Sequence, residues 1–349
     1  MTKASGRRSR RPTMVDVARE AGVAVSTVSR VVNQDPTVGP EFARRVQTAI
    51  DTLGYRPDEQ AQQLRRGTSR TIGVAAREMS ARNPLLAEFE RGAYAAGLTV
   101  FAASTADDVE RERTVVLSMA RRGFDGVVVE PIGPDHSYLA PEIATGLAVV
   151  AVDRPVAGPE TDAVLADNTA GIRMAYRQLT AHGHTRIAYI GDHERIFTGR
   201  ERAAAFRACL SADGRAVTGL VHTGETVQSR ISAAMRAVLS ADPPVTALVT
   251  GNVTTTLGVL THLAAEVPPE HRPALVGFDD FPLAGLLDPP VTVISQDSMA
   301  MAHAALHLMT ARLAEPERAP ETITVPVTLT ARGSGERPPR PPGPPGPPH

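Results

Sequence analysis

The stretch from Thr13 to Tyr55 reads TMVDVAREAGVAVSTVSRVVNQDPTVGPEFARRVQTAIDTLGY. Its apolar residues recur at helical spacing in three runs. These runs predict helices over residues 13–21, 24–32 and 41–53. Gly22 and Gly54 stand where the first and third helices end, since glycine accepts the left-handed turn that closes a helix. Two short helices joined by such a tight turn indicate a helix-turn-helix, which places its second helix in the major groove of duplex DNA.

Each predicted helix has one apolar face that must be buried. The three faces consist of Met14, Val17, Ala18 and Ala21, then Val28, Val31 and Val32, and finally Phe42, Val46, Ala49, Ile50 and Leu53. The second helix keeps Val25, Ser26 and Arg30 outside this core. A guanidinium can bond a guanine edge with two hydrogen bonds, a hydroxyl can reach several bases, and a valine can pack on a thymine methyl.

Charge is distributed unevenly along the 349 residues, although the net charge is only −1. Up to Arg70, one lysine and twelve arginines stand against seven acidic residues, a balance of +6, so the remainder carries −7. A basic front joined to an acidic body is typical of a nucleic-acid module attached to a second domain.

The composition also bounds the cellular context. Cys209 is the only cysteine, so no disulfide can form within the chain, and its helical pattern predicts a thiol in the core. The N-terminal sequence MTKASGRRSRRP has no apolar run behind it, unlike a secretory signal. No stretch approaches the ~20 apolar residues of a membrane span. We therefore expect a cytoplasmic protein without a membrane partner.

From Arg70 onward, apolar strand-like runs alternate with helical patterns. This alternation predicts parallel sheets with helices on both faces, and the runs are too many for one small sheet, so we expect two similar α/β lobes. Ligands of open α/β sheets lie at the carboxyl ends of strands. The residues that follow the predicted strands are therefore candidates for a binding site, namely 104–108, 153–154, 192–202, 251–252 and 279–280.

Changes in composition divide the chain into five predicted parts. They are a disordered basic arm at 1–12, the helix-turn-helix unit at 13–57, a polar helical pattern with a flexible joint at 58–69, the two-lobed body at 70–332, and a disordered or polyproline tail at 333–349. The arm is open to two interpretations, a solvated tail or an additional phosphate contact. No leucine heptad follows the body, so we expect a dimer without a tail-mediated tetramer.

Three motifs follow one another in the front part, TMVDVAREAGVAVSTVSRVVN, LGYRP and AQQLRR, before an IGV strand. The body adds RNP at 82–84, RRGFDGVVV, VDRPV, ADN at 166–168, HGHTRIAYIG, RERAAAF, LVGFDD and PPVTVISQD. In this order the motifs resemble the lactose-repressor/galactose-repressor family of bacterial transcription regulators over residues 13–332. The resemblance implies an all-α helix-turn-helix domain followed by an α/β body of two Rossmann-like lobes, similar to the periplasmic binding proteins.

The resemblance also implies a mechanism. Two chains form a homodimer on a near-palindromic operator in double-stranded DNA, with one recognition helix of each in a major groove. Hinge helices fold on the DNA and insert a leucine into the central minor groove, which kinks the duplex. A small-molecule effector, a sugar or related metabolite, binds between the lobes and alters the hinge. Operator affinity then falls or, in some members, rises. The expected function is a transcriptional regulator, namely a repressor.

Positions that match the family motifs carry the expected contacts. The base-reading residues are Val25, Ser26 and Arg30, and the phosphate contacts are Thr13, Thr27, Ser29 and Asn33. Leu64 is the expected wedge, with Ala61 and Gln62 beside it in the groove. The effector contacts are expected at Asn83, Arg154, Arg202, Asn252, Asp279 and Gln296. Arginine, asparagine and aspartate that converge on a cleft suit a polyhydroxylated ligand, because each bonds hydroxyl or carboxyl groups.

Some positions depart from the family pattern. Ala24 stands where the family usually has a helix-capping serine, so the cap is lost. A sugar site normally has an aromatic platform, for which this chain offers Phe101, Phe197, Phe278 and Phe281. These departures leave open a larger, more apolar effector, or a body that serves only as a dimer platform. For the motif residues themselves, a purely structural interpretation also stays open, in which Arg200 and Arg202 form a solvated helix face and Asp279 and Asp280 cap a turn.

Two other functional classes fit parts of the sequence. An extracytoplasmic solute-binding protein shares the two-lobed body, but the basic front domain and the missing signal oppose it. An enzyme is opposed by the absence of HExxH, GxSxG, GxxxxGK[ST] and a GxGxxG after a strand. His182 and His184 lie at a predicted helix end, where they bond carbonyls more readily than a metal. We therefore expect no catalytic residues, no metal and no cofactor.

Overall fold

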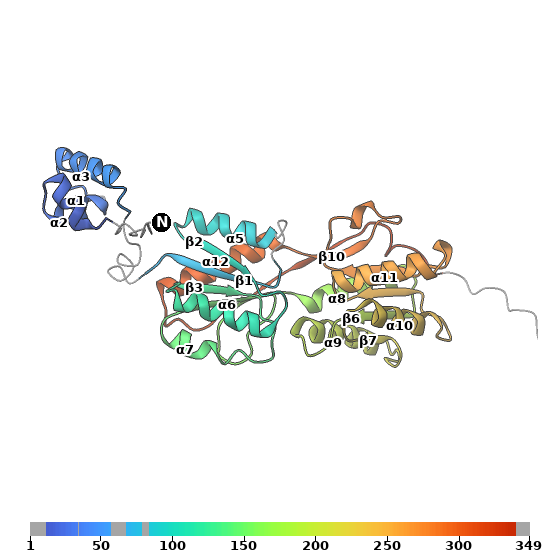
Figure 1. Cartoon of the computed structure of the whole chain (residues 1–349). Helices are drawn as coiled ribbons and strands as arrows, with labels where there is room; N and C mark the ends of the chain where they lie inside the picture. Colours follow the sequence, from blue (N-terminus) through green and yellow to red (C-terminus); the bar gives the residue numbers. More distant parts are fainter. Residues whose placement is uncertain (1–11, 34, 57–67, 79–83, 340–349) are drawn as a thin grey trace, which may run out of the picture. The chain divides into compact units, whose positions relative to one another are not determined.

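The computed structural model describes residues 12–33, 35–56, 68–78 and 84–339. The chain divides into two compact units, residues 1–69 and 70–349. The first unit contains α1 (Met14–Ala21), α2 (Val25–Val32) and α3 (Pro40–Leu53), labelled in Figure 1. The three predicted helices are therefore confirmed, each within one residue of its expected bounds.

The ends of these helices show why the chain folds locally in this way. The Thr13 hydroxyl accepts a hydrogen bond from the Asp16 backbone N–H, and the Asp16 carboxylate accepts one from the Thr13 backbone N–H at 2.9 Å, which forms a capping box. Gly22 (φ 61°) and Gly54 (φ 62°) close α1 and α3 in the left-handed conformation, as predicted. Ala24 precedes α2 and makes no side-chain cap, which confirms the expected loss.

The core of this unit follows the predicted faces with one exception. Its buried residues are Val17, Ala18, Ala21, Val28, Val46, Ala49 and Tyr55. The prediction that Phe42 is buried is wrong, because its side chain is 48% exposed and its ring lies near the guanidinium of Arg45. Helical spacing assigns Phe42 to the correct face, but α3 has 14 residues and its two partners have eight each, so they do not cover its first turn.

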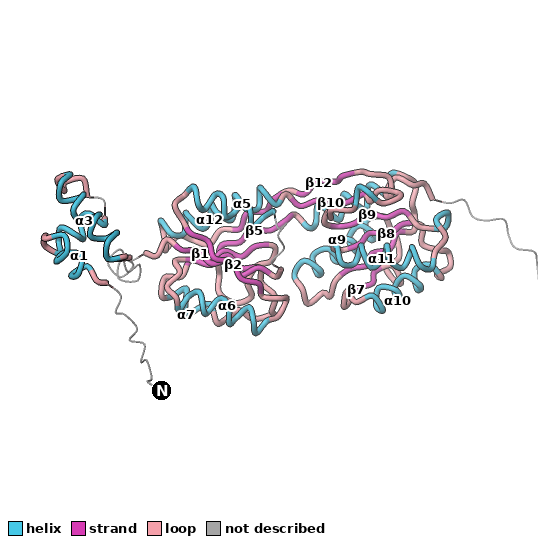
Figure 2. Tube along the Cα trace, turned by 45° about the horizontal axis from the view of Figure 1, so that its top comes forward, coloured by secondary structure: helices cyan, strands magenta, loops and turns pink. Residues whose placement is uncertain are grey.

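The second unit contains two sheets, each of six strands, in two lobes (Figure 2). In lobe 1 the strand order is β11-β5-β4-β3-β1-β2, and all neighbours are parallel. The strands are β1 (Thr71–Ala76), β2 (Thr99–Ser104), β3 (Gly126–Val129), β4 (Ala148–Val152), β5 (Asp162–Ala166) and β11 (Thr322–Val325). The helices are α5 (Pro84–Ala95), α6 (Val109–Arg121), α7 (Leu139–Ala144) and α12 (Ser298–Ala314).

Lobe 2 repeats this plan with the order β12-β10-β9-β8-β6-β7. Its strands are β6 (Ile187–Gly191), β7 (Val221–Thr223), β8 (Ala247–Thr250), β9 (Ala274–Phe278), β10 (Thr292–Gln296) and β12 (Val327–Thr330). Its helices are α8 (Asn168–Ala181), α9 (Phe197–Ala212), α10 (Gln228–Leu239) and α11 (Val253–Glu266), with 3-10 turns at Pro269–His271 and Ala284–Leu286. The predicted two-lobed α/β body is confirmed, except that β12 runs antiparallel to β10.

The chain passes between the lobes three times, at residues 166–168, 296–298 and 325–327. The first two passages each end in a capping aspartate. Asp167 accepts a hydrogen bond from Ala170 N–H at 2.8 Å, and Asp297 accepts one from Ala300 N–H at 2.9 Å. Because helices start directly after these passages, the side chains that flank them are held in defined positions.

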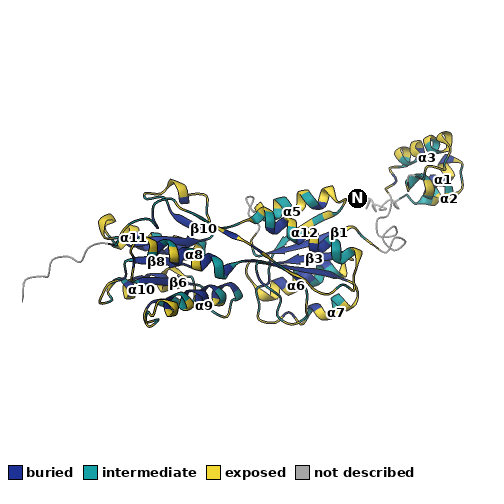
Figure 3. Cartoon of the chain, turned by 180° about the vertical axis from the view of Figure 1, so that it is seen from behind, coloured by how far each residue is buried: buried dark blue, intermediate teal, exposed yellow. Residues whose placement is uncertain are grey.

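Apolar strands form the interior of both lobes, as the buried residues in Figure 3 show. In lobe 1, one face of the sheet packs against α5 and α12, and the other against α6 and α7. In lobe 2, strand residues pack against α8 to α11 in one large cluster. Cys209 is half-buried against that cluster, in agreement with its predicted place in the core. Two rigid sheets thus support the loops at the carboxyl ends of their strands.

The prediction of a disordered tail from residue 333 is wrong for residues 333–339. Ser334 is buried, its hydroxyl accepts a hydrogen bond from Thr292 N–H at 2.9 Å, and it donates one to the carbonyl of Leu275 at 2.6 Å. Glu336 accepts a hydrogen bond from the Thr292 hydroxyl at 2.7 Å. The proline and glycine content of the whole tail suggested disorder, but Ser334 and Glu336 make specific hydrogen bonds to lobe 2 that composition does not reveal. Residues 340–349 lie outside the described residues, as do residues 1–11 of the predicted arm.

The two histidines at the end of α8 contact backbone carbonyls, as predicted. His182 lies 2.8 Å from the Gln178 carbonyl, and His184 lies 2.7 Å from the Arg337 carbonyl. Burial lowers the pKa of His184, which favours a neutral ring, and this ring helps to hold Arg337 against lobe 2. Within the described residues, no helix is both long and apolar enough to cross a membrane.

Candidate nucleic-acid interface and effector cavity

Helix α2 presents one buried and one exposed side. Val28 is fully buried in the core of the first unit, whereas Val25 is 41% exposed and Ser26 and Arg30 are exposed as well. Within the part of the chain that the structure describes, the side chain of Arg30 makes no hydrogen bond or ion pair. The tight turn at Gly22 places α2 so that these three residues point away from α1 and α3. This arrangement leaves a guanidinium, a hydroxyl and a methyl surface available to base edges.

The predicted phosphate contacts have different surroundings. The Thr13 hydroxyl donates a hydrogen bond to the Asp16 carboxylate at 2.7 Å within the capping box, so this hydroxyl is already used at the start of α1. Asn33 donates a hydrogen bond from Nδ2 to the Ser29 carbonyl at 2.8 Å at the end of α2. Thr27 and Ser29 are partly buried. The groove residues Ala61, Gln62 and Leu64 lie outside the described residues.

A cavity of about 260 Å³ lies between the two lobes, at the carboxyl ends of their strands. Its lining contains Arg77, Glu78, Asp153, Arg154, Asp192, Thr198, Gly199, Arg202, Gly251, Asn252, Val253, Thr254 and Asp279. Four of the six predicted effector residues are among them. Gln296 contacts the cavity through Asp279, and Asn83 lies outside the described residues. The rule that ligands bind at strand ends therefore located the residues that share this cavity.

Arg202 is the most constrained residue of the cavity. It lies on α9, is 3% exposed, and its guanidinium stacks 3.7 Å above the Phe278 ring. Its Nε donates to Asn168 Oδ1 at 2.6 Å, and its Nη1 donates to the Gly251 carbonyl at 2.6 Å. Nη1 also lies 3.4 Å from an Asp279 carboxylate oxygen. A solvated helix face is therefore excluded for Arg202, although Arg200 is exposed beside Phe197.

Asp279 directly follows β9 and adopts a left-handed backbone conformation (φ 70°), which is unusual for a residue with a side chain. Its carboxylate accepts a hydrogen bond from Gln296 Nε2 at 2.6 Å and faces Arg202. Burial raises the pKa of this carboxyl, with a further contribution from Asp153, while Arg202 opposes the rise. Asp153, which follows β4 in lobe 1, has a similar backbone (φ 68°). Strained residues of this kind concentrate at functional sites.

Asn252 caps α11 and links it to the neighbouring strand end. Its Oδ1 accepts a hydrogen bond from Thr255 N–H at 2.8 Å, and its Nδ2 donates to Asp192 Oδ2 at 3.2 Å. Asp192 also accepts a hydrogen bond from His193 N–H at 2.9 Å. The amide of Asn252 is therefore engaged within lobe 2, and it fixes the carboxylate of Asp192 at the cavity wall.

Lobe 1 supplies two further guanidiniums. Arg154 is 6% exposed, lies with Nε 3.3 Å from Asp153 Oδ2, and donates to the Pro131 carbonyl at 3.3 Å. Burial lowers the pKa of Arg154. Arg77 pairs with Asp107 at 2.8 Å. Its backbone N–H donates to Glu130 at 2.7 Å, and burial raises the pKa of Glu130. These contacts fix the charged groups on the wall opposite Arg202.

The contributors to this site that the sequence did not indicate include Arg77, Glu78 and Asn168. Arg77 and Glu78 directly follow β1, so the strand-end rule could have found them. Asn168 belongs to the ADN motif, but the sequence alone predicted no ligand or supporting contact for it. It is 4% exposed and supports Arg202 from the start of α8. The aromatic candidates do not form a platform, because no aromatic side chain among the described residues lines the cavity, and Phe278 is covered by Arg202.

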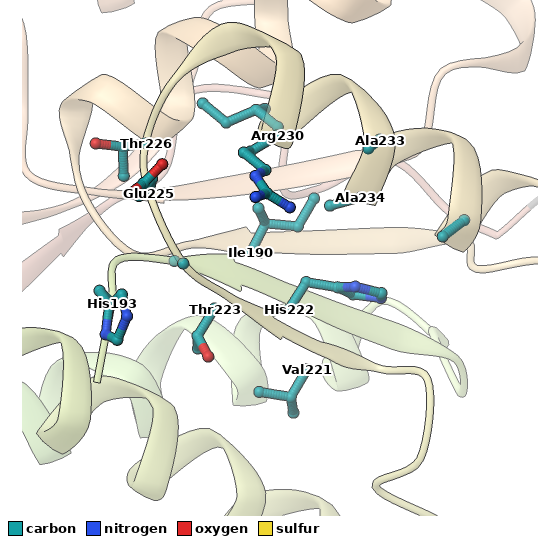
Figure 4. Close-up of a pocket in the computed structure, with 14 residues that line it drawn as sticks. Ile190, His193, Val221, His222, Thr223, Glu225, Thr226, Arg230, Ala233 and Ala234 are labelled. Atoms are coloured by element: carbon teal, nitrogen blue, oxygen red, sulfur yellow. The ribbon is translucent and has the colours of Figure 1, made fainter. Parts of the chain in front are cut away.

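A larger cavity of about 630 Å³ lies within lobe 2, between β6, β7 and α10 (Figure 4). Its lining includes His193, His222, Arg230 and several alanines of α10. None of the predicted effector residues borders it. We therefore take the smaller cavity between the lobes as the candidate effector site.

Comparisons with known proteins agree with both units. Residues 13–58 match the family described as "Bacterial regulatory proteins, lacI family", and residues 176–335 match the "Periplasmic binding protein-like domain". The transcriptional regulator GalS of Salmonella typhimurium is 31% identical over 301 residues, which cover 85% of this chain and 88% of GalS. The ribose operon repressor of Escherichia coli is 29% identical over 333 residues, which cover 92% of this chain and 99% of that protein.

Among solved structures, the lac repressor dimer bound to operator and the anti-inducer ONPF has the same fold. Its TM-score is 0.79 at 23% identity, over 93% of this chain and 99% of that chain. The sequence match to GalS extends from the helix-turn-helix unit into the body, so it does not rest on one domain alone. The chain therefore belongs to the lacI family of bacterial regulatory proteins and combines a DNA-binding helix-turn-helix with a periplasmic-binding-protein-like effector domain.

Proposed function

We propose that this chain represses transcription by binding a near-palindromic operator as a homodimer, and that a small-molecule effector in the cavity between the lobes controls this binding. The observation that carries the proposal is the exposed face of α2, where Val25, Ser26 and Arg30 lie opposite the buried Val28. One such face offers few base contacts. Two faces at a fixed spacing supply the specificity that one lacks.

Exposed apolar residues on the body support the homodimer. In lobe 2, Leu257 is 45%, Leu283 is 58% and Leu286 is 80% exposed. In lobe 1, Tyr94 is 78% and Phe101 is 56% exposed. Exposed apolar side chains of this size are candidates for a surface that a second copy covers. Replacement of Leu286 by Asp is therefore expected to shift the chain from dimer to monomer in sedimentation velocity.

The cavity supports the effector part of the proposal. It lies between two rigid sheets and gathers Arg154, Arg202, Asn252 and Asp279, with Gln296 behind Asp279. The named relatives include a ribose operon repressor, and we propose a sugar or related metabolite for this chain as well. Those relatives are regulators of transcription and not enzymes, and they act on DNA, which also supports a cytoplasmic location.

The role of Leu64 as a wedge in the minor groove remains a prediction from the motif AQQLRR. A leucine wedge would kink the central base step of the operator. The variant Leu64→Ala is expected to weaken operator binding and to reduce DNA bending in a circular-permutation gel assay. Unchanged bending would exclude the wedge.

Selection from random duplexes tests the main proposal. The full chain is expected to enrich a near-palindrome whose half-site centres lie about one helical turn, roughly 34–36 Å, apart. Failure to enrich any palindrome would contradict operator binding as a dimer. Thermal unfolding with sugars, sugar phosphates and nucleosides tests the effector part separately. Stabilisation by none of them would favour a body that serves only as a dimer platform.

A further inference from the structure

Three guanidiniums line the cavity between the lobes, and each already has a carboxylate beside it. The pairs are Arg202 with Asp279 at 3.4 Å, Arg154 with Asp153 at 3.3 Å, and Arg77 with Asp107 at 2.8 Å. The positive charge that could bind a phosphate or carboxylate of a ligand is therefore balanced within the protein. Each arginine keeps further N–H groups for a neutral hydroxyl, because a guanidinium has five donors.

Two more carboxylates line the cavity and form no ion pair among the described residues. Asp192 is held by hydrogen bonds from Asn252 Nδ2 at 3.2 Å and from His193 N–H at 2.9 Å. Glu78 is exposed at the cavity edge and has neither an ion pair nor a hydrogen bond in the described ranges. Both are hydrogen-bond acceptors, and among the described lining residues four carboxylates therefore stand against three guanidiniums.

The surroundings of the neighbouring carboxyls also disfavour an added negative charge. Burial raises the pKa of Asp279 and of Glu130, and the charge of Asp153 raises both further. An additional anion in this partly dehydrated space would meet repulsion that solvent screens poorly. A neutral polyol avoids it, since its hydroxyls donate to the carboxylates and accept from the guanidiniums.

We propose that the cavity takes an uncharged, polyhydroxylated ligand and rejects its phosphorylated or carboxylated forms, with Asp192 as a residue that determines this specificity. The inference rests on the proposed effector site and names its ligand class. Asp192 is suited to the task because it is a partly buried lining carboxylate that forms no ion pair with an arginine among the described residues, although its charge acts on Arg154. Asn252 keeps it aimed at the cavity and does not neutralise its charge.

Matched ligand pairs test the ligand class. The full chain would be titrated calorimetrically with ribose and ribose 5-phosphate, glucose and glucose 6-phosphate, and galactose and galactonate. At least one neutral member is expected to bind, and its anionic counterpart to bind at least tenfold more weakly. The proposal is overturned if an anionic member binds as tightly as its neutral partner, or if no neutral member binds.

Two variants test the specificity residue. Asp192→Asn keeps the shape and one of the two hydrogen bonds that the carboxylate accepts but removes the charge, so the discrimination between a neutral ligand and its anionic counterpart should fall at least fivefold. Glu194→Gln is the control, because Glu194 pairs with Arg207 and does not line the cavity. Unchanged discrimination in Asp192→Asn, or an equal loss in both variants, would remove Asp192 from this role.

Operator binding by the same preparations separates two kinds of failure. If the chain selects a palindrome and only anionic ligands release it, the ligand class is wrong and the proposed function stands. If it selects no palindrome, the proposed function itself fails.

Discussion

Arg202 Nε donates a hydrogen bond to Asn168 Oδ1 over 2.6 Å, so the cavity between the lobes is joined to the first helical residue after the chain enters lobe 2. On its other side Arg202 faces Asp279, which accepts a hydrogen bond from Gln296. Gln296 ends β10, directly before the second passage between the lobes. Four side chains thus connect two inter-lobe passages through the cavity. A ligand that competes for Arg202 or Asp279 would act on both passages.

Removing the acceptor of Asn168 should destabilise the body. In Asn168→Leu the buried Nε of Arg202 loses its partner, and an unsatisfied buried donor costs about 1–3 kcal/mol. The free energy of unfolding in urea is expected to fall by that amount. Asn168→Asp retains an acceptor and should lose less. Arg200→Ala, an exposed change on the same helix, is the control, and an equal loss there would contradict the assignment.

The variant Arg30→Ala should weaken and broaden operator recognition. A bidentate contact to guanine contributes about 1–3 kcal/mol of discrimination, so affinity for the selected operator should fall roughly 5- to 150-fold, with relaxed preference at one base pair of each half-site. Fluorescence anisotropy on operator variants measures this. Gln47→Ala, on the exposed side of α3, serves as the control. A uniform loss on all sequences would instead assign Arg30 to phosphate contact.

A serine at position 24 should stabilise the first unit. Ala24 has the extended backbone of an N-cap (φ −70°, ψ 150°) but lacks an acceptor for the free N–H groups of α2. Ala24→Ser restores the acceptor and should raise stability by about 0.5–2 kcal/mol. The thermal transition of this unit, followed by circular dichroism, is the measurement. Ala24→Val should give no gain, and a gain of equal size would show that capping is not the cause.

The carboxyl of Asp279 should leave a signature in the pH dependence of stability. Its folded pKa is raised mainly by burial, so the folded state binds the proton more tightly than the unfolded state. This contribution is complete below the unfolded pKa of about 3.9 and is lost as pH rises through the folded pKa. The stability of the wild type relative to Asp279→Asn should therefore decline as pH rises from about 4 to 7. Urea unfolding of both proteins across this range measures it, and a difference that grows with pH would contradict the direction.

Local sequence signals predicted much of the fold. The spacing of Val17, Ala18 and Ala21, the cap at Thr13 and the glycine at position 22 act over a few residues, so their consequences can be inferred without the rest of the chain. The main buried strands were recognised for the same reason. Strands β5, β7, β11 and β12 were not. Strands β7, β11 and β12 have three or four residues and a mixed burial pattern that gives little periodicity, and β5 is a short run of five residues.

The site was predicted less completely. Arg202 and Asp279 could be named from strand ends and motifs, but their partners come from distant segments. Asn168 and Arg202 are 34 residues apart, and Arg202 and Asp279 are 77 apart. The pairing of every cavity arginine with a carboxylate, and the covering of Phe278 by Arg202, depend on how two sheets pack and where the chain passes between them.

The sequence was sufficient to identify a helix-turn-helix with Val25, Ser26 and Arg30 on its free face, followed by two α/β lobes. These features follow from helical and strand periodicity and from glycine and threonine at helix ends, which are short-range effects. The balance of charge in the cavity, the exposure of Phe42 and the ordered Ser334 required the folded structure. Each depends on contacts between segments far apart in the chain, and no local pattern encodes which of those segments meet.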